Sequence, residues 1–299
     1  MSRLKLSTLM ILFLSAAVIL ALGTRNIFGA QPASGGSALS STVYLWYYLP
    51  HDPSQPPEPI EKAKYLGNYD VLYIGPTDEK ALYLTFDDCP NNDNISKILD
   101  TLKEHNATAA FFMTEDFIRR CPEVIRRVVD EGSVVCNHTS SHGSVTGLSF
   151  DRFKAELTGV EDAYREATGQ ELPKFFRPPQ GRFSEITLSY AEKLGYTTVF
   201  WSFRYEDWND YHQPSAEQAY KTIISETHPG EILLLHSQSS TNVRILDQLM
   251  DTWEEQGYTF KSLSDIPDIH KVDSSQRINK QQKRSARDAP WRYAMITAI

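Results

Sequence analysis

From Ala81 onward, short apolar runs alternate with segments of helical spacing, and this alternation restricts the possible folds more than any other feature of the chain. The segments between the runs carry apolar residues at intervals of three and four, as amphipathic helices do. Regular alternation of strands and helices produces parallel strands with helices packed outside them. The sequence therefore predicts an α/β fold, with strands at 83–86, 109–112, 133–136, 174–176, 197–201, 231–235 and 258–260.

Polar side chains follow these runs where the expected strands end. An open doubly wound sheet and a closed barrel both fit the alternation, but in β/α barrels the carboxyl ends of the strands form one active face. Well-separated segments would then deliver functional groups to a single rim, which favours the barrel. These side chains are Asp87, Asp88, His138, His142, Arg177, Asp207, Trp208 and His236.

The segment His138-Thr-Ser-Ser-His142 is a candidate metal site. Two histidines four residues apart can reach one ion from a helical turn or a compact loop, and imidazole is a good ligand for zinc and its neighbours. Taken alone, the pair fits a surface or core role equally well. Asp88, at the end of a neighbouring strand, completes a His₂–carboxylate set with positions left open for water and substrate, which suits metal-assisted hydrolysis.

Asp87 is a candidate general base. It adjoins Asp88, and the two side chains must point in different directions if the strand geometry persists. One aspartate can therefore bind metal while the other takes a proton from the attacking water. The alternative role, capping the next helix, is better filled by Asp93 or Asn94.

Arg177 and Asp207 are expected to hold the catalytic groups in place. Arg177 precedes Pro178 and Pro179, whose fixed φ makes a stiff loop, and its fork can pair with a carboxylate and keep it ionised. Asp207 can orient His236 and raise its pKa, so that the imidazole protonates a leaving amine. The alternatives are a surface arginine and a histidine satisfied within the core.

The net charge of the chain indicates which partners it can bind, and its N-terminal segment indicates where in the cell it is located. The formal net charge is −8 although the tail from Lys271 is basic, so the rest of the chain is strongly acidic. Such a protein repels phosphates, which excludes nucleic acid as a partner. Arg3 and Lys5 precede the uncharged run 6–23, which is typical of an export signal or a membrane anchor. We expect an extracytoplasmic protein, secreted or anchored to the outer face of the membrane.

The expected organisation has four parts: a signal or anchor (1–24), a linker and N-terminal extension (25–80), the catalytic domain (81–268) and a basic, disordered tail (269–299). Residues 42–80 should wrap on the main domain, with a glycan-contacting lip as the alternative. Cys89, Cys121 and Cys136 form no complete disulfide framework, although one bridge is possible outside the cell. We expect a monomer.

Five segments, in order along the chain, resemble the motifs of polysaccharide deacetylases of the nodulation-protein type, carbohydrate esterase family four. The resemblance covers about 81–266 and implies a distorted seven-stranded (β/α) barrel. The segments are Thr85-Phe86-Asp87-Asp88-Cys89-Pro90, His138-Thr-Ser-Ser-His142, Arg177-Pro178-Pro179-Gln180-Gly181, the stretch 201–208, and Leu234-Leu235-His236.

The resemblance implies roles for individual residues. Asp87 would be the general base, steadied by Arg177, and His236 the acid. Asp88, His138 and His142 would bind one divalent metal ion, Zn²⁺, with Co²⁺ or Mn²⁺ as alternatives. The implied substrate contacts are Leu235 in the acetyl-methyl pocket, the backbone N–H of Gln180, Trp208 and Arg182.

Within the family, the phrases 176–184, 198–202 and 257–262 resemble the branch that deacetylates N-acetylmuramic acid in spore-cortex peptidoglycan. The resemblance implies peptidoglycan strands as the substrate, and Arg182 on the rim could bind the lactyl carboxylate with two hydrogen bonds. The alternatives are a chitooligosaccharide or N-acetylglucosamine deacetylase and an O-acetyl polysaccharide esterase. A non-catalytic glycan-binding protein is disfavoured because Asp87 and His236 are both present.

Overall fold

The computed structural model describes residues 38–48, 57–59, 63–87, 93–209 and 211–266. It divides into two compact units, residues 1–39 and 40–299, and the elements below belong to the second. The expectations for the N-terminal segment 1–24, for Asp88 and Cys89, and for the tail 269–299 lie outside the described residues. Within those residues, no helix has the length and apolarity of a membrane span.

All seven expected strands are present and parallel, although several are shorter than their apolar runs. Two short strands join them, so the described sheet has nine. Its order is β2-β8-β6-β5-β4-β3-β10-β9, with β11 paired to the start of β3. The strands are β2 (Val71–Leu72), β3 (Ala81–Asp87), β4 (Ala110–Met113), β5 (Val134–Asn137), β6 (Phe175–Phe176), β8 (Thr197–Val199), β9 (Phe203–Arg204), β10 (Glu231–His236) and β11 (Thr259–Phe260).

The link between β8 and β9 shows that the sheet curls into a barrel. The two strands lie near opposite ends of the strand order, yet residues 200–202 alone separate them in sequence. The Ser202 N–H donates to the Ile232 carbonyl on β10 (3.0 Å), and the Phe200 N–H to the Leu72 carbonyl on β2 (2.7 Å). Because so short a link cannot span an open sheet, the two edges must meet. The predicted distorted β/α barrel is confirmed.

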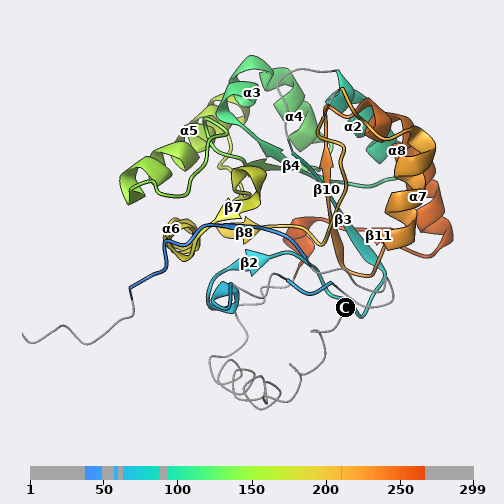
Figure 1. The fold of residues 1–299 in the computed structure, drawn as a ribbon. Helices are drawn as coiled ribbons and strands as arrows, with labels where there is room; N and C mark the ends of the chain where they lie inside the picture. The colour runs from blue at the N-terminus through green and yellow to red at the C-terminus, as the bar shows by residue number, and fades with distance from the viewer. Residues whose placement is uncertain (1–37, 49–56, 60–62, 88–92, 210, 267–299) are drawn as a thin grey trace, which may run out of the picture. The chain divides into compact units, whose positions relative to one another are not determined.

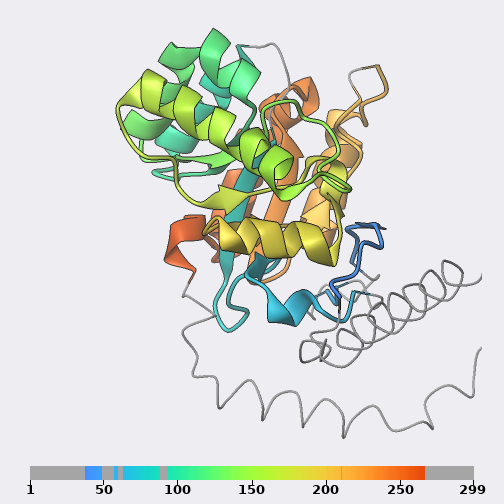
Figure 2. The ribbon, with the colours of Figure 1, turned by 90° about the vertical axis from the view of Figure 1, so that its left-hand side faces the viewer.

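Helices cover the outside of the sheet on both sides (Figure 1). Helices α2, α7 and α8 lie beside β3 and β10, α3, α4 and α5 lie beside β4, and α6 lies next to α5 (Figure 2). Four of them begin at a serine whose side chain accepts a backbone N–H of the first turn. The helices are α2 (Asn94–Glu104), α3 (Glu115–Arg120), α4 (Pro122–Asp130), α5 (Phe150–Thr168), α6 (Glu185–Lys193), α7 (Ala216–Glu226) and α8 (Ser240–Glu255).

Strand β3 alternates between the two sides of the barrel wall. Leu82, Leu84 and Phe86 belong to the large apolar cluster under the helices, whereas Ala81 and Tyr83 belong to the interior cluster. Since successive side chains of a strand point to opposite faces, Thr85 and Asp87 continue the inward row. The last residue of the strand, Asp87, therefore places its carboxylate in the barrel interior.

The N-terminal extension packs on the barrel. Strand β1 (Tyr44–Leu45) pairs antiparallel with β7 (Arg182–Phe183). Trp46 is 3% exposed, stacks on Phe200 at 4.3 Å between ring centroids, and donates its indole N–H to the Trp201 carbonyl (2.9 Å). The extension thus closes the wall beside the β8–β9 link.

His105, which follows α2, ties that helix to α8. Its Nδ1 lies 3.2 Å from Glu254 Oε1 and its Nε2 lies 3.1 Å from Asp247 Oδ1. The atoms of His105, Asp251 and Glu254 are also close enough to share a metal ion. However, burial that would lower the pKa of His105 is outweighed by these two carboxylates, which raise it. A cationic imidazole whose two nitrogens both contact carboxylates is suited to holding α2 and α8 together and is poorly suited to binding a metal ion.

We expect His105 to make stability depend on pH. Because its folded-state pKa is raised, its contribution should be fully present below the unfolded value of about 6.5 and be lost as pH rises through the folded pKa. Urea unfolding of wild type and His105→Asn on either side of this window measures the effect. At the acidic pH, the free energy of unfolding of wild type should exceed that of His105→Asn. This difference should shrink at the alkaline pH. A difference that grows with pH would contradict this sign.

Candidate active site

The inward-facing end of β3 meets residues from three other segments at the carboxyl ends of the strands. Asp87 pairs in register with His236 at the end of β10. His138 follows β5, and Arg177 follows β6. In parallel β/α folds this end of the sheet carries the functional groups. The structure thus brings the expected base, acid and one expected metal ligand to one place.

Arg177 is the buried centre of this arrangement, with no exposed surface. Its Nη1 donates to Asp87 Oδ1 (2.6 Å), and its Nη2 donates to Thr85 Oγ1 (2.9 Å) and the Phe200 carbonyl (3.2 Å). The guanidinium also lies 4.0 Å from the centre of the Phe112 ring. The expected forked ion pair is wrong, because one arm of the fork serves Thr85 and the backbone instead of the second carboxylate oxygen.

The pair with Arg177 determines the ionisation of Asp87. Burial by itself would raise the pKa of this carboxyl group, but the charge of Arg177, followed by those of His138 and His236, lowers it below its ordinary value. Asp87 is 7% exposed and ionised at neutral pH. Its Oδ2 atom is not used by Arg177 and can accept a proton.

His138 has one nitrogen engaged and the other free. Its Nδ1 lies 2.9 Å from the Arg177 carbonyl, and since a carbonyl can only accept, Nδ1 carries the proton. Its Nε2 faces Asp87 Oδ2 at 3.6 Å, which is too long for a hydrogen bond. Burial lowers the pKa of His138 to about 4, so the ring is neutral. A neutral imidazole held by a backbone carbonyl is the form that binds metal ions.

His142 approaches His138 through a compact loop. The two ring centroids are 4.9 Å apart. Thr139 (φ 72°) and His142 (φ 53°) both adopt left-handed backbone, which costs about 1–3 kcal/mol per residue and is typical of functional sites. Asn137 Oδ1 accepts from the Thr139 N–H, and Thr139 Oγ1 accepts from the His142 N–H, both at 3.0 Å. The loop geometry therefore brings the two imidazoles together, with burial lowering the pKa of His142.

His236 lies on the other side of Asp87, held by Asp207. Asp207 is fully buried and accepts from His236 Nδ1 (2.8 Å) and from the His236 backbone N–H (2.7 Å). Burial would lower the pKa of His236, but the hydrogen bond and charge of Asp207, together with the charge of Asp87, raise it. His236 can therefore carry a proton at neutral pH.

The structure places the expected substrate contacts unequally. Leu235 is wrong as a lining residue: it is 1% exposed and packs with the helix-facing cluster, because it alternates with His236 along β10. Leu234 lies on the other face, in the cluster that contains Trp201. Gln180 is exposed, with φ of 60°, at the turn η2 (Pro179–Gly181).

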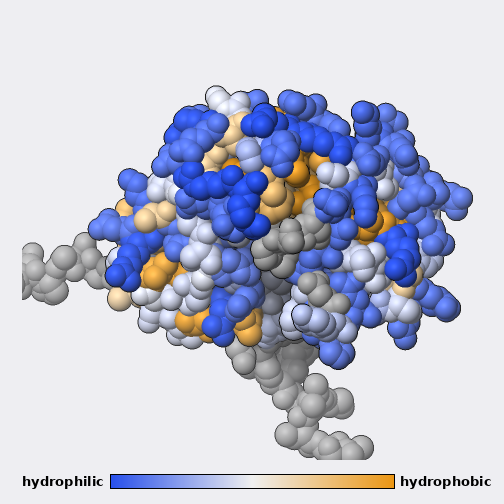
Figure 3. Space-filling model, turned by 90° about the horizontal axis from the view of Figure 1, so that it is seen from above, coloured by the Kyte–Doolittle hydropathy of each residue, from blue (hydrophilic) through white to orange (hydrophobic). Residues whose placement is uncertain are grey.

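Large apolar side chains are exposed at two places in the described part of the second unit. The face in Figure 3 is mostly hydrophilic, with smaller apolar areas. Along the extension, Val43, Leu45 and Tyr47 point outward, and Leu45 pairs in register with the exposed Arg182. Trp208, which follows Asp207, is 56% exposed, and Tyr211 lies nearby in sequence.

Two residues of the site were missed in the sequence analysis. Thr85 shares the inward face with Asp87, and its position two residues earlier could have identified it. Asn242, on the first turn of α8, donates to Asp207 Oδ2 at 2.6 Å. Nothing in the sequence marks Asn242, because its partner lies 35 residues away in a loop.

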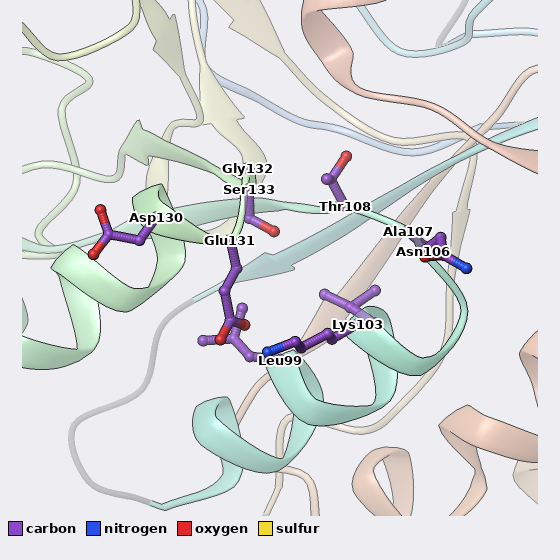
Figure 4. Close-up of a pocket in the computed structure, with 10 residues that line it drawn as sticks. Leu99, Lys103, Asn106, Ala107, Thr108, Asp130, Glu131, Gly132 and Ser133 are labelled. Atoms are coloured by element: carbon purple, nitrogen blue, oxygen red, sulfur yellow. The ribbon is translucent and has the colours of Figure 1, made fainter.

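A separate hollow of about 540 Å³ lies at the opposite ends of the strands (Figure 4). It is lined by α2, by the end of α4 and by residues that precede β4 and β5, such as Thr108 and Ser133. Since the candidate catalytic groups follow the strands, this hollow is not part of their site.

Comparison with known proteins gives consistent matches. The family model described as polysaccharide deacetylase matches residues 74–199. The chain is 38% identical over 238 residues to the peptidoglycan-N-acetylmuramic acid deacetylase PdaA of Bacillus subtilis. The aligned region covers 78% of this chain and 90% of that protein. It is 42% identical over 231 residues to an uncharacterised protein of Geobacillus stearothermophilus, covering 77% and 87%. The solved structure of Bacillus subtilis PdaA, a family 4 carbohydrate esterase, aligns with a TM-score of 0.73, at 37% identity, over 76% of this chain and 98% of that one.

Proposed function

Because this chain belongs to the polysaccharide deacetylase family, we propose that it is a metal-dependent hydrolase that removes the acetyl group from N-acetylmuramic acid in peptidoglycan strands. The observation that carries the proposal is the placement of an ionised carboxylate, Asp87, between a neutral histidine pair and His236, whose pKa is raised by Asp207 despite burial. Amide hydrolysis needs these groups: a base for the attacking water and an acid for the leaving amine.

In this proposal each residue has a separate task. Asp87 takes the proton of the attacking water at Oδ2, while Arg177 keeps the carboxylate ionised and oriented. His236 donates its Nε2 proton to the leaving nitrogen, and Asp207 holds the ring through Nδ1. A bound divalent ion would polarise the acetyl carbonyl and make water more acidic.

The metal ligands proposed are His138, His142 and Asp88. The donor set fits such an ion, because His138 presents a bare Nε2 and the His142 ring stands beside it. Two imidazoles with one carboxylate are a common set for zinc, while cobalt and manganese use similar ligands.

We expect His138→Ala to lose most of its bound metal. Elemental analysis of wild type and variant, purified in parallel, measures the difference. His105→Ala is the matched control, since its cluster with Asp251 and Glu254 could also attract an ion. Equal metal content in wild type and His138→Ala, with metal loss in His105→Ala, would move the site to the α2–α8 surface.

Substrate contacts are proposed from placement around this centre. The backbone N–H of Gln180 would face the developing oxyanion, and Trp208 would contact a sugar ring, because it is exposed directly after Asp207. Leu234, which shares the inward face with His236, replaces Leu235 as the candidate for the acetyl-methyl contact.

Arg182 is proposed to recognise the lactyl carboxylate of muramic acid. Its side chain is exposed, and no ion pair engages it among the described residues. The lactyl carboxylate of a peptide-free muramic acid can accept two hydrogen bonds from a guanidinium, whereas an N-acetylglucosamine of chitin offers no such group. Arg182 would thus favour muramic strands.

We expect Arg182→Ala to lower kcat/KM roughly ten- to hundredfold on peptide-free muramic strands, the effect of losing one charge-assisted contact. Residual activity on chitooligosaccharides should change little. Arg152→Ala, which removes another exposed arginine on α5, is the control and should change neither. Equal loss on both substrates would remove Arg182 as the cause of selectivity, and faster turnover of chitooligosaccharides by wild type would redirect the substrate assignment.

The proposed substrate also requires a location outside the cytoplasm, where peptidoglycan lies. Arg3 and Lys5 before the apolar run 6–23 are the sequence basis for export or for anchoring at the outer face of the membrane.

A further inference from the structure

Asp207 is a fully buried carboxylate whose hydrogen bonds come from two residues. His236 supplies two donors, its ring Nδ1 to Oδ1 and its backbone N–H to Oδ2. Asn242 Nδ2 supplies a third, to Oδ2 at 2.6 Å. Among the described residues, no lysine or arginine pairs with Asp207. Since a buried carboxylate without enough donors is costly, Asn242 has a large share in keeping this group in place.

The orientation of the Asn242 amide is determined by its neighbours. Its Oδ1 accepts from the Tyr205 hydroxyl, and its Nδ2 also faces the His236 carbonyl at 3.1 Å. Reversing the amide would turn its oxygen toward the Asp207 carboxylate and its NH₂ toward a hydroxyl, leaving two acceptors in contact. The Asn242 backbone N–H donates to Ser239 Oγ (3.1 Å), which fixes the first turn of α8. Asn242 is 2% exposed, so water does not compete for these bonds.

We infer that Asn242 is a positioning residue, which holds Asp207 with Oδ1 directed at His236 Nδ1 and thereby fixes the tautomer and direction of the imidazole. The Tyr205 hydroxyl supports Asn242 in the same way. The chain Tyr205–Asn242–Asp207–His236 thus joins β10, the loop that follows β9, and α8 through three buried side chains and the partly exposed ring of His236. The inference takes from the proposed function only the role of His236 as the acid.

The effect of Asn242 on the protonation of His236 must be separated from the effects of the charged groups around this histidine. Asp207 and Asp87 favour its protonated form, whereas Arg177 and His142 oppose it. Of these groups, Asp207 alone is hydrogen-bonded to Asn242 in the structure. A change at Asn242 therefore acts on His236 through Asp207, and the remaining charges serve as a constant background.

The test is an NMR titration of the His236 ring in the full chain, with wild type and Asn242→Leu loaded with the same metal. Leucine keeps the volume but removes both hydrogen-bonding groups. The imidazole should titrate about one pH unit lower in the variant, the effect of losing one charge-assisted bond next to the ion pair. The alkaline limb of kcat/KM should move by the same amount, with KM little changed.

Two further variants keep the inference falsifiable. Tyr205→Phe frees the amide while leaving it in place and should shift the titration less, in the same direction. Thr241→Val, a neighbouring change that removes the bond to the Pro214 carbonyl, should leave it unchanged. An unshifted His236 in folded Asn242→Leu overturns the inference. If that variant does not fold, an unshifted His236 in Tyr205→Phe does so. Absence of deacetylase activity in wild type would refute the proposed function, while the titration would still test Asn242.

Discussion

Asp87→Asn should abolish most activity while leaving the protein folded and its metal content unchanged. The amide cannot accept the proton of the attacking water, and losing a general base typically costs about 10²–10⁴-fold in rate. The fold should survive because the amide oxygen can still accept the hydrogen bond from Arg177 Nη1. Turnover of peptide-free glycan strands, measured beside elemental analysis and a thermal unfolding curve, gives all three quantities.

The matched control is Asp88→Asn, one residue further along. It should weaken metal binding, and its activity should recover when excess metal is supplied, whereas that of Asp87→Asn should not. If Asp87→Asn lost the metal while Asp88→Asn kept it, the two aspartates would have exchanged roles.

Arg177→Met should cause the largest loss of stability of any single change at the site. Removing one partner of a buried ion pair typically costs about 3–5 kcal/mol, because the other charge stays buried without compensation. Here the Asp87 carboxylate, Thr85 Oγ1 and two backbone carbonyls lose their donor together. The pKa of Asp87 should also rise, since burial would then act unopposed by the guanidinium. Activity should fall with it at neutral pH.

Urea unfolding measures the free-energy loss, and Arg119→Met is the control. Arg119 pairs with Glu115 one helical turn away and with Glu166, but its side chain is 41% exposed, so losing these exposed pairs should cost about 1 kcal/mol or less. Similar losses for both variants would mean that Arg177 acts as an ordinary surface arginine. If Arg177→Met does not fold, Arg177→Lys keeps the charge with fewer donors and should fall between the two.

The fold could be predicted from the sequence because its strands are buried on both faces. A continuous apolar run such as 232–235 is typical of parallel strands covered by helices, and all seven expected segments form strands. The closure of the barrel could not be obtained from periodicity. It depends on the three-residue link between β8 and β9 and on Trp46 of the extension, neither of which alternates regularly. The short strands β2 and β9 were missed for the same reason.

The sequence predicts which site residues meet when those residues directly follow strands. It does not predict which hydrogen bonds their side chains make. Asp87, His138, Arg177 and His236 meet because parallel strands end at one edge. The fork of Arg177 divides between Asp87 and the wall of the barrel, which no spacing could indicate. Leu235 was placed on the wrong side of β10, although strict alternation from His236 would have selected Leu234.

The left-handed backbone of the loop 138–142 could also not be predicted from the sequence. Positive φ is uncommon for any residue with a side chain, and it is a clear outlier for the β-branched Thr139. Hydrogen bonds from Asn137 and within the loop stabilise a conformation that Thr139 and His142 rarely adopt.

The most direct test of the proposed function is mass spectrometry of glycans after incubation with the metal-loaded protein. Peptide-free peptidoglycan strands, chitooligosaccharides and acetylated xylan are offered in parallel, with Asp87→Asn as the blank. We predict that muramic acid residues of the peptidoglycan strands lose one acetyl group each, faster than any change in the other two. Loss of acetyl groups from N-acetylglucosamine or xylan alone would contradict the proposed substrate. No loss from any glycan by a metal-loaded, folded wild type would contradict the proposed enzyme itself.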